Sequence, residues 1–253
     1  MIPFVDPPRL PTIDLSLFDV GDPWRDHVAA QVDWAASTFG LFQIQGHGVD
    51  PALIDTLLEI GGKYVALEGG LANRGAGTEL PGFHDTVREY ATTMTGLGHK
   101  LMTTLARGLR LVDSFFVDRY SGSPVTTLRI HDHPVLRSDR RAVELGARDD
   151  RSLLTIVKLG DTGGQQFLLD GRWVDIPALP HALLCYVGPV LEQLTAGRYV
   201  AATHRLSRAD SLLRPSVSFS FEPHPGTPLT PVLGVRTRSA GVGSARYAFE
   251  ARC

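Results

Sequence analysis

The feature that most constrains the fold is a change of sequence pattern near residue 125. From there on, short runs of four to eight residues are separated by turn-forming residues. The runs are Thr126–Ile130, Leu153–Leu159, Gln165–Leu169, Trp173–Ile176, Leu183–Val187, Val200–Thr203 and Val217–Phe221. Several short strands at such spacing are typical of an antiparallel sandwich or barrel. We therefore predict that the second half of the chain is rich in β-strands.

The first half of the chain has helical spacing instead. Two stretches, Trp24–Phe39 and His84–Leu111, place their apolar residues on one helical face, and Asp50 followed by Pro51 marks the start of another helix. The predicted helices are Trp24–Phe39, Pro51–Leu67 and His84–Leu111. Short strands are predicted at Pro11–Leu15 and Gly40–Gly46, and a mobile glycine-rich loop at Gly69–Gly82.

Length and composition limit the classes of function. With 253 residues the chain is long enough for one large domain. We predict a single domain over residues 1–253, with a helical part at 1–120 and a strand-rich core at 121–253. The net charge of −2 provides no basic field, so nucleic acid is not expected as a partner.

Targeting and membrane-spanning segments in a sequence indicate where a protein is located. We see no signal-peptide pattern and no apolar stretch of membrane-spanning length. We therefore expect no membrane partner and, by default, a cytoplasmic location. Two cysteines do not make a disulfide framework, and Cys185 lies in an apolar run that predicts a buried strand residue.

An ordered set of short motifs runs through nearly the whole chain. They are Leu10–Leu15, Phe39–Val49, Leu153–Ile156, Gly163–Gln166, Trp173–Pro177, Gly188–Glu192 and Thr195–Tyr199. In this order they resemble the isopenicillin N synthase-like branch of the Fe(II)/2-oxoglutarate-dependent dioxygenases. The resemblance implies a mainly β fold with flanking helices around a double-stranded β-helix, the cupin-like jelly roll. It also implies a small-molecule substrate, and we expect a role in secondary metabolism.

The resemblance implies an iron site, but the sequence departs from it. The family holds Fe(II) with an H-x-D pair and a distant His, whereas this chain has Arg148-x-Asp150 and, later, His204. Because residues i and i+2 of a strand share a face, we expect Arg148 and Asp150 side by side, opposite His204. Arg has no lone pair for a metal and stays protonated. We therefore expect no cofactor at the usual site.

The positions that the resemblance assigns to 2-oxoglutarate are partly kept. Arg214 and Ser216 match the family's pair for the distal carboxylate of 2-oxoglutarate. The planar fork of Arg214 suits a carboxylate held by two hydrogen bonds, and a structural salt bridge is the alternative interpretation. A ligand that bears a carboxylate is therefore expected with or without iron.

A second departure lies in the strand that reads R-x-N-x-Y-P in the family. Here residues 129–134 read R-I-H-D-H-P, so His131 and His133 replace the Asn and the Tyr. The two imidazoles either hydrogen-bond the pocket, or supply a relocated metal ligand, or act as acid and base, because His titrates near neutrality. We favour acid–base catalysis or substrate binding, because Arg148 would lie close to such a metal.

Three functions remain open at this stage. The first is a metal-independent enzyme that catalyses a cyclisation, an isomerisation or an elimination of a small molecule. The second is an Fe(II)/2-oxoglutarate oxygenase with a rearranged ligand set of Asp150, His204 and His131. The third is a non-catalytic relative that serves as a partner subunit, so an oligomer or a heteromeric partner also stays open. The candidate catalytic residues are His131, His133, Arg148, Asp150 and His204.

Overall fold

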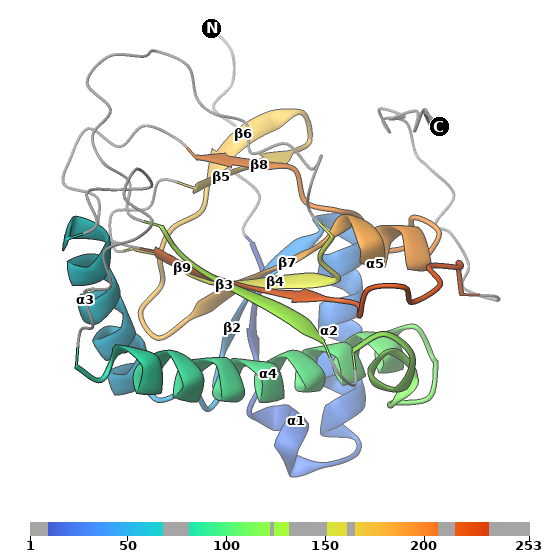
Figure 1. Ribbon diagram of the computed structural model, residues 1–253. Coiled ribbons are helices and arrows are strands. Elements are labelled where there is room, and N and C mark those ends of the chain that lie inside the picture. Colours follow the sequence, from blue (N-terminus) through green and yellow to red (C-terminus); the bar gives the residue numbers. More distant parts are fainter. Residues whose placement is uncertain are drawn as a thin grey trace, which may run out of the picture.

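In the computed structural model of the protein, the described residues are 10–67, 81–121, 124–131, 151–160, 165–206 and 216–232. Figure 1 shows three layers: a larger β-sheet in the middle, a smaller sheet on one side of it, and the long helix α4 across the other side. Helices α2 and α3 stand towards opposite ends of the larger sheet (Figure 1). This arrangement leaves one face of the larger sheet for the helices and the other for the smaller sheet.

The helices and strands have the following bounds. The helices are α1 (Leu17–Val20), α2 (Trp24–Thr38), α3 (Pro51–Leu67), α4 (Phe83–Gly108) and α5 (Pro189–Leu194), with a π-helical turn at Val117–Ser121. The first strands are β1 (Thr12–Asp14), β2 (Leu41–Gln45), β3 (Val125–His131) and β4 (Leu154–Lys158). The remaining strands are β5 (Gln165–Leu169), β6 (Arg172–Asp175), β7 (Leu183–Val187), β8 (His204–Leu206) and β9 (Ser216–Glu222).

The strands pair in an order that differs from their order in the sequence. The larger sheet has the order β1-β2-β7-β4-β9-β3, and the smaller sheet has the order β6-β5-β8. Among the described pairs, β1 and β2 run parallel and every other pair is antiparallel. Strands from distant parts of the chain thus become neighbours, and β1 and β2 extend the larger sheet from the N-terminal part.

The helix layer is held by the apolar stripe predicted for the third helix. Tyr90, Met94 and Leu101 of α4 are fully buried in the main core cluster. Burying apolar side chains such as Met94 and Leu101 contributes roughly 1.5–3 kcal/mol each relative to leaving them exposed. The helix ends at Gly108, three residues before the predicted end, because Arg110 adopts a left-handed backbone conformation with φ +60°. None of the helices in the described segments combines the length and apolar character needed to span a lipid bilayer.

Local sequence signals located most of the elements. The predicted bounds of α3, β5 and β7 agree with the structure, and the amide of Ala52 donates to the Asp50 carboxylate, as expected of a helix cap. The thiol of Cys185 is fully buried, as predicted, and burial raises its pKa. The predicted loop at Gly69–Gly82 lies outside the described residues apart from its last residues.

The strand predicted at Val200–Thr203 is wrong, because the strand begins at His204. The backbone of residues 200–203 bonds to three different elements: Val200 donates to Ala36 of α2, Ala202 donates to Val187 of β7, and Thr203 accepts from Leu168 of β5. A strand requires a run of bonds to one neighbour, and that run with β5 covers only His204–Leu206. The apolar pattern alone could not reveal this division of partners.

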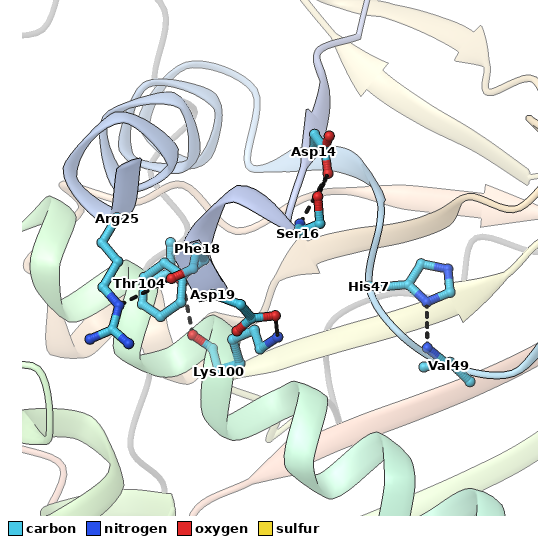
Figure 2. A network of polar contacts seen from close by, with 9 residues as sticks. All are labelled: Asp14, Ser16, Phe18, Asp19, Arg25, His47, Val49, Lys100 and Thr104. Atoms are coloured by element: carbon cyan, nitrogen blue, oxygen red, sulfur yellow. Dashed lines mark hydrogen bonds and ion pairs between the residues drawn. The ribbon is translucent and has the colours of Figure 1, made fainter. Parts of the chain in front are cut away.

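Short polar contacts fix the chain where it enters the first helices (Figure 2). The Ser16 hydroxyl donates to Asp14 at 2.6 Å, and the Lys100 ammonium of α4 reaches the Asp19 carboxylate of α1 at 2.7 Å. Asp19 is largely exposed, and exposed ion pairs are worth about 0–1 kcal/mol. These contacts orient α1 against α4 without contributing much to the overall stability.

The turn after β2 contains a histidine whose contacts require its neutral form. The Val49 amide donates to Nδ1 of His47 at 3.1 Å, and Nε2 of His47 lies 3.2 Å from the His181 carbonyl. Figure 2 shows the His47–Val49 contact. A nitrogen that accepts cannot carry a proton, so Nε2 must be the protonated nitrogen. Burial lowers the pKa of His47 below its usual value of 6.5, although the bond to the His181 carbonyl raises this pKa in part.

We expect acid to destabilise the wild type more than a His47→Asn variant. The pKa of His47 is lowered in the folded state, so the unfolded chain binds more protons as the pH falls below about 6.5. The stability that the neutral imidazole contributes is therefore present above that pH and is lost as the pH falls. The Asn amide oxygen takes the position of Nδ1 and can accept from Val49, but it does not titrate. Urea unfolding from about pH 7.5 down to about pH 5.5 measures the difference, and parallel stability curves for the two proteins would contradict it.

Candidate functional site

The larger sheet has two chemically different faces, because side chains alternate along each strand. On its outer face Phe219 and Phe221 of β9 enter the main core with the helices, and Gly98 of α4 lies against the Phe221 ring. On its inner face Tyr186 of β7 packs with Phe167 of the smaller sheet in a second core cluster. The two sheets therefore enclose an interior between them.

His204 lies at this interior. It is the first residue of β8 and pairs with Phe167 of β5. The His204 ring is partly buried, with its centroid 4.8 Å from the Tyr186 ring and 5.5 Å from the Phe167 ring. Nδ1 lies 3.3 Å from the Ala202 carbonyl, which can only accept, so Nδ1 donates a proton in this contact.

A row of hydroxyl groups crosses the inner face beside His204. The register aligns Tyr186 of β7 with Thr155 of β4, Thr155 with Ser220 of β9, and Ser220 with Thr127 of β3. The Thr155 hydroxyl lies 3.2 Å from the Ser220 hydroxyl, and the Thr127 hydroxyl donates to Glu222 at 3.2 Å. Sequence reasoning missed this row. The signal was present in residues 216–222, which read S-V-S-F-S-F-E and alternate polar with apolar.

Two of the predicted site positions pair directly across strands. The register places His131, the last residue of β3, opposite Ser216, the first residue of β9. Positions 216, 218 and 220 share the inner face, since 217, 219 and 221 belong to the main core. Four other candidates lie outside the described residues: His133, Arg148, Asp150 and Arg214.

The chain immediately after Asp150 is anchored to the larger sheet. Ser152 is fully buried, and its carbonyl accepts from the Val190 amide of α5 at 3.2 Å. The next residue, Leu153, donates to the Phe221 carbonyl at 2.8 Å and accepts from the Gly188 amide at 3.0 Å. A Cβ at Gly188 would overlap the backbone and hydroxyl of Ser152, so these segments meet with no spare room. From Ser152 onward, the described chain is thus held closely against the larger sheet and α5.

Of the positions that the resemblance assigns to iron, the structure describes one, His204. No group of three or more His, Cys, Asp or Glu side chains that could hold a metal exists within the described segments. The sequence has Arg148 and Asp150 at the other two positions, and both lie outside the described residues. An Arg side chain has no lone pair for a metal, whereas the family's set is two His and one carboxylate.

The fold and the interior site define a class: helices around a double-stranded β-helix with a histidine between its two sheets. The sequence pattern described as the non-haem dioxygenase in morphine synthesis N-terminal region matches residues 10–68. The pattern of the 2OG-Fe(II) oxygenase superfamily matches residues 113–223. Together these matches span more than half of the 253 residues. The chain belongs to the 2OG-Fe(II) oxygenase superfamily.

Similar proteins agree with this family. A 1-aminocyclopropane-1-carboxylate oxidase of Musa acuminata is 24% identical, covering 91% of this chain and 88% of the relative. A Dictyostelium discoideum protein named as an iron/ascorbate oxidoreductase is 26% identical over 78% of this chain and 76% of its own length. The crystal structure of a 2OG-Fe(II) oxygenase family protein from Caulobacter crescentus has a TM-score of 0.72 at 19% identity, covering 85% of this chain and 87% of that one. The predicted jelly-roll fold is therefore confirmed.

Proposed function

We propose that this protein is a metal-independent enzyme that acts on a small molecule bearing a carboxylate or a carbonyl group. The observation that carries the proposal is the polar interior: His204 and the Thr155–Ser220 hydroxyl pair line the space between the sheets. A chain that had lost all chemistry in this space would be free to fill it with apolar side chains. The relatives include a flavonol synthase and a gibberellin oxidase, which supports a role in secondary metabolism.

The proposed reaction is a proton transfer. One imidazole of the pair His131 and His133 removes a proton from carbon beside the carbonyl, and a protonated imidazole returns it at another atom, or a leaving group departs. Arg148 stabilises the negative charge that develops on the carbonyl oxygen. Arg214 and Ser216 hold the carboxylate of the same molecule. Such an isomerisation or elimination leaves the overall oxidation state unchanged, so it needs neither O2 nor a reductant.

The test follows a panel of small keto acids and hydroxy acids by mass spectrometry, under anaerobic conditions with a chelator present. We expect turnover of at least one member by the wild type. His131→Ala and Arg148→Ala should each lower that turnover by roughly 100-fold, the scale of losing a general base or an oxyanion contact. The exposed substitution His224→Ala serves as the control and should leave turnover unchanged.

A second candidate is an Fe(II)/2-oxoglutarate oxygenase whose ligands are rearranged to Asp150, His204 and His131. The partly buried imidazole of His204 between the two sheets favours it, as does a relative whose name includes iron. Metal analysis and activity assays on untagged protein, purified with Fe(II) supplied, distinguish the two candidate functions. Turnover that requires Fe(II), O2 and 2-oxoglutarate, with about one iron per chain, would establish the oxygenase and defeat the metal-independent enzyme. Absence of turnover together with a co-purifying protein partner would indicate a non-catalytic subunit.

A further inference from the structure

We infer that Arg205 is a positioning residue, which holds the strand β8 in place and thereby fixes the His204 imidazole in the interior. Arg205 follows His204 directly in β8, and adjacent residues of a strand point to opposite faces. His204 faces the interior with Phe167, so Arg205 lies on the outer face of the smaller sheet. The inference rests on the proposed function, because the position of His204 matters to a reaction only if the interior is the site.

The backbone of β8 makes only a short ladder. Among the described strands β8 lies at the edge of the smaller sheet and pairs with β5, over the three residues His204–Leu206. A segment held by few backbone bonds at a sheet edge opens locally at a lower cost in free energy than a central strand. The position of a side chain on β8 therefore depends on contacts besides this ladder.

The Arg205 side chain supplies such contacts to both other strands of the smaller sheet. Its Nε donates to Oε1 of Gln166 in β5 at 2.8 Å, and its guanidinium carbon lies 4.1 Å from the centre of the Trp173 ring in β6. Because β6 and β8 lie on either side of β5, the side chain crosses the whole sheet. A planar guanidinium can stack on an aromatic face and donate from its edge at the same time, which a Lys ammonium cannot do.

Gln166 is held in the orientation that its bond to Arg205 requires. Its Nε2 donates to the Asp175 carboxylate of β6 at 3.1 Å, while its Oε1 accepts from Arg205. The register places Gln166 opposite Asp175 on one side and opposite Arg205 on the other. The amide thus connects an anion to a cation, and each of them fits only one end of it. With Trp173, this row ties the three strands together on the outer face.

On the inner face, the same three-residue strand carries the His204 ring. The ring centre lies 4.8 Å from that of Tyr186 and 5.5 Å from that of Phe167. Tyr186 belongs to β7 of the larger sheet, so this contact joins the two sheets. Reacting groups must be held within about 0.5 Å of their working position, and a shift of β8 relative to β5 would move the imidazole off Tyr186. The contacts of Arg205 on the outer face therefore control the place of His204 on the inner face.

The experiment measures the nuclear Overhauser effect between the His204 and Tyr186 rings in full-length, chelator-treated protein without substrate. A His204→Asn variant, which lacks the imidazole, assigns the signal. We expect the signal in the wild type and its loss in Arg205→Ala and in Trp173→Leu, which keeps apolar bulk but no ring. Trp173→Phe keeps an aromatic face and should retain the signal. Arg205→Lys keeps the charge but not the planar fork, so its signal should be intermediate. Thermal melting verifies that each variant is folded.

Arg119→Ala is the matched control. The Arg119 guanidinium also lies over an aromatic ring, 4.4 Å from the centre of Phe115, but in the π-helical turn at Val117–Ser121, and its loss changes the net charge equally. The inference is overturned if Arg119→Ala weakens the signal as much as Arg205→Ala does, or if folded Arg205→Ala retains it in full. Equal signals in Trp173→Leu and Trp173→Phe would also overturn it. Absence of turnover on every substrate would defeat the proposed function but not this inference, because the signal is measured without substrate.

Discussion

An Arg148→His variant is expected to bind Mn(II) or Fe(II) at least about 100-fold more tightly than the wild type. Loss of an outer-sphere partner alone costs a metal site about 10–100-fold in affinity, and an Arg at a ligand position would remove a ligand and add a positive charge as well. An imidazole restored at position 148 would complete, with Asp150 and His204, the two-His, one-carboxylate composition that suits Fe(II). Anaerobic calorimetry on untagged protein measures the gain.

Two further variants separate the effect of the added imidazole ligand from the effect of removing the Arg148 charge. Arg148→Ala removes the positive charge without adding a donor, so we expect only a small part of the gain. Combining Arg148→His with His204→Ala should abolish the gain, because the restored site again has two donors. Equal metal affinity in the wild type and in Arg148→His would show that Arg148 does not stand at a ligand position.

A Gly188→Ala substitution is expected to destabilise the fold by about 1–3 kcal/mol, the usual range for overpacking a closely fitted site. The backbone at Gly188 is extended and suits any residue, so the cost is steric. The new methyl group would meet the carbonyl and hydroxyl of Ser152. Backbone atoms cannot turn aside as a side-chain tip can, so β4 must shift against α5. Urea unfolding at neutral pH gives the difference in free energy.

The matched control is Gly96→Ala in α4, where a Cβ meets open space. Alanine is favoured over glycine inside a helix by about 0.5–1 kcal/mol, so this variant should be slightly more stable than the wild type. The same methyl group thus has opposite effects at two positions. If Gly188→Ala proves as stable as the wild type, the close contact with Ser152 has been overstated.

The Gly188→Ala variant also connects the fold to the site. Ser152 lies two residues after Asp150, so a displaced Ser152 should move the segment that carries this carboxylate. We expect ligand binding to weaken in Gly188→Ala even at temperatures where it is fully folded. Gly96→Ala, which lies in the helix layer, should bind ligands as the wild type does.

The sequence by itself determined most of the secondary structure and the family. Pro51 after Asp50 marked the start of α3, and an unbroken apolar run located β7, because these signals act within a few residues. The ordered motifs predicted the double-stranded β-helix, and both family patterns match the chain. His204 was singled out from its sequence motif, and it lies at the start of β8 beside the interior.

The tertiary structure decided which polar groups share the interior. Tyr186 meets the His204 ring, and Arg129 lies opposite Ser218, although each pair comes from strands that are separate in the chain. Nothing in the local pattern of β3 states which strand lies beside it. Pairing and register depend on long-range burial, and a shift by a single residue would turn every side chain of a strand to the other face. The helices and strands can therefore be predicted from neighbouring residues in the sequence. The set of side chains that line the interior is defined only by how the strands pair.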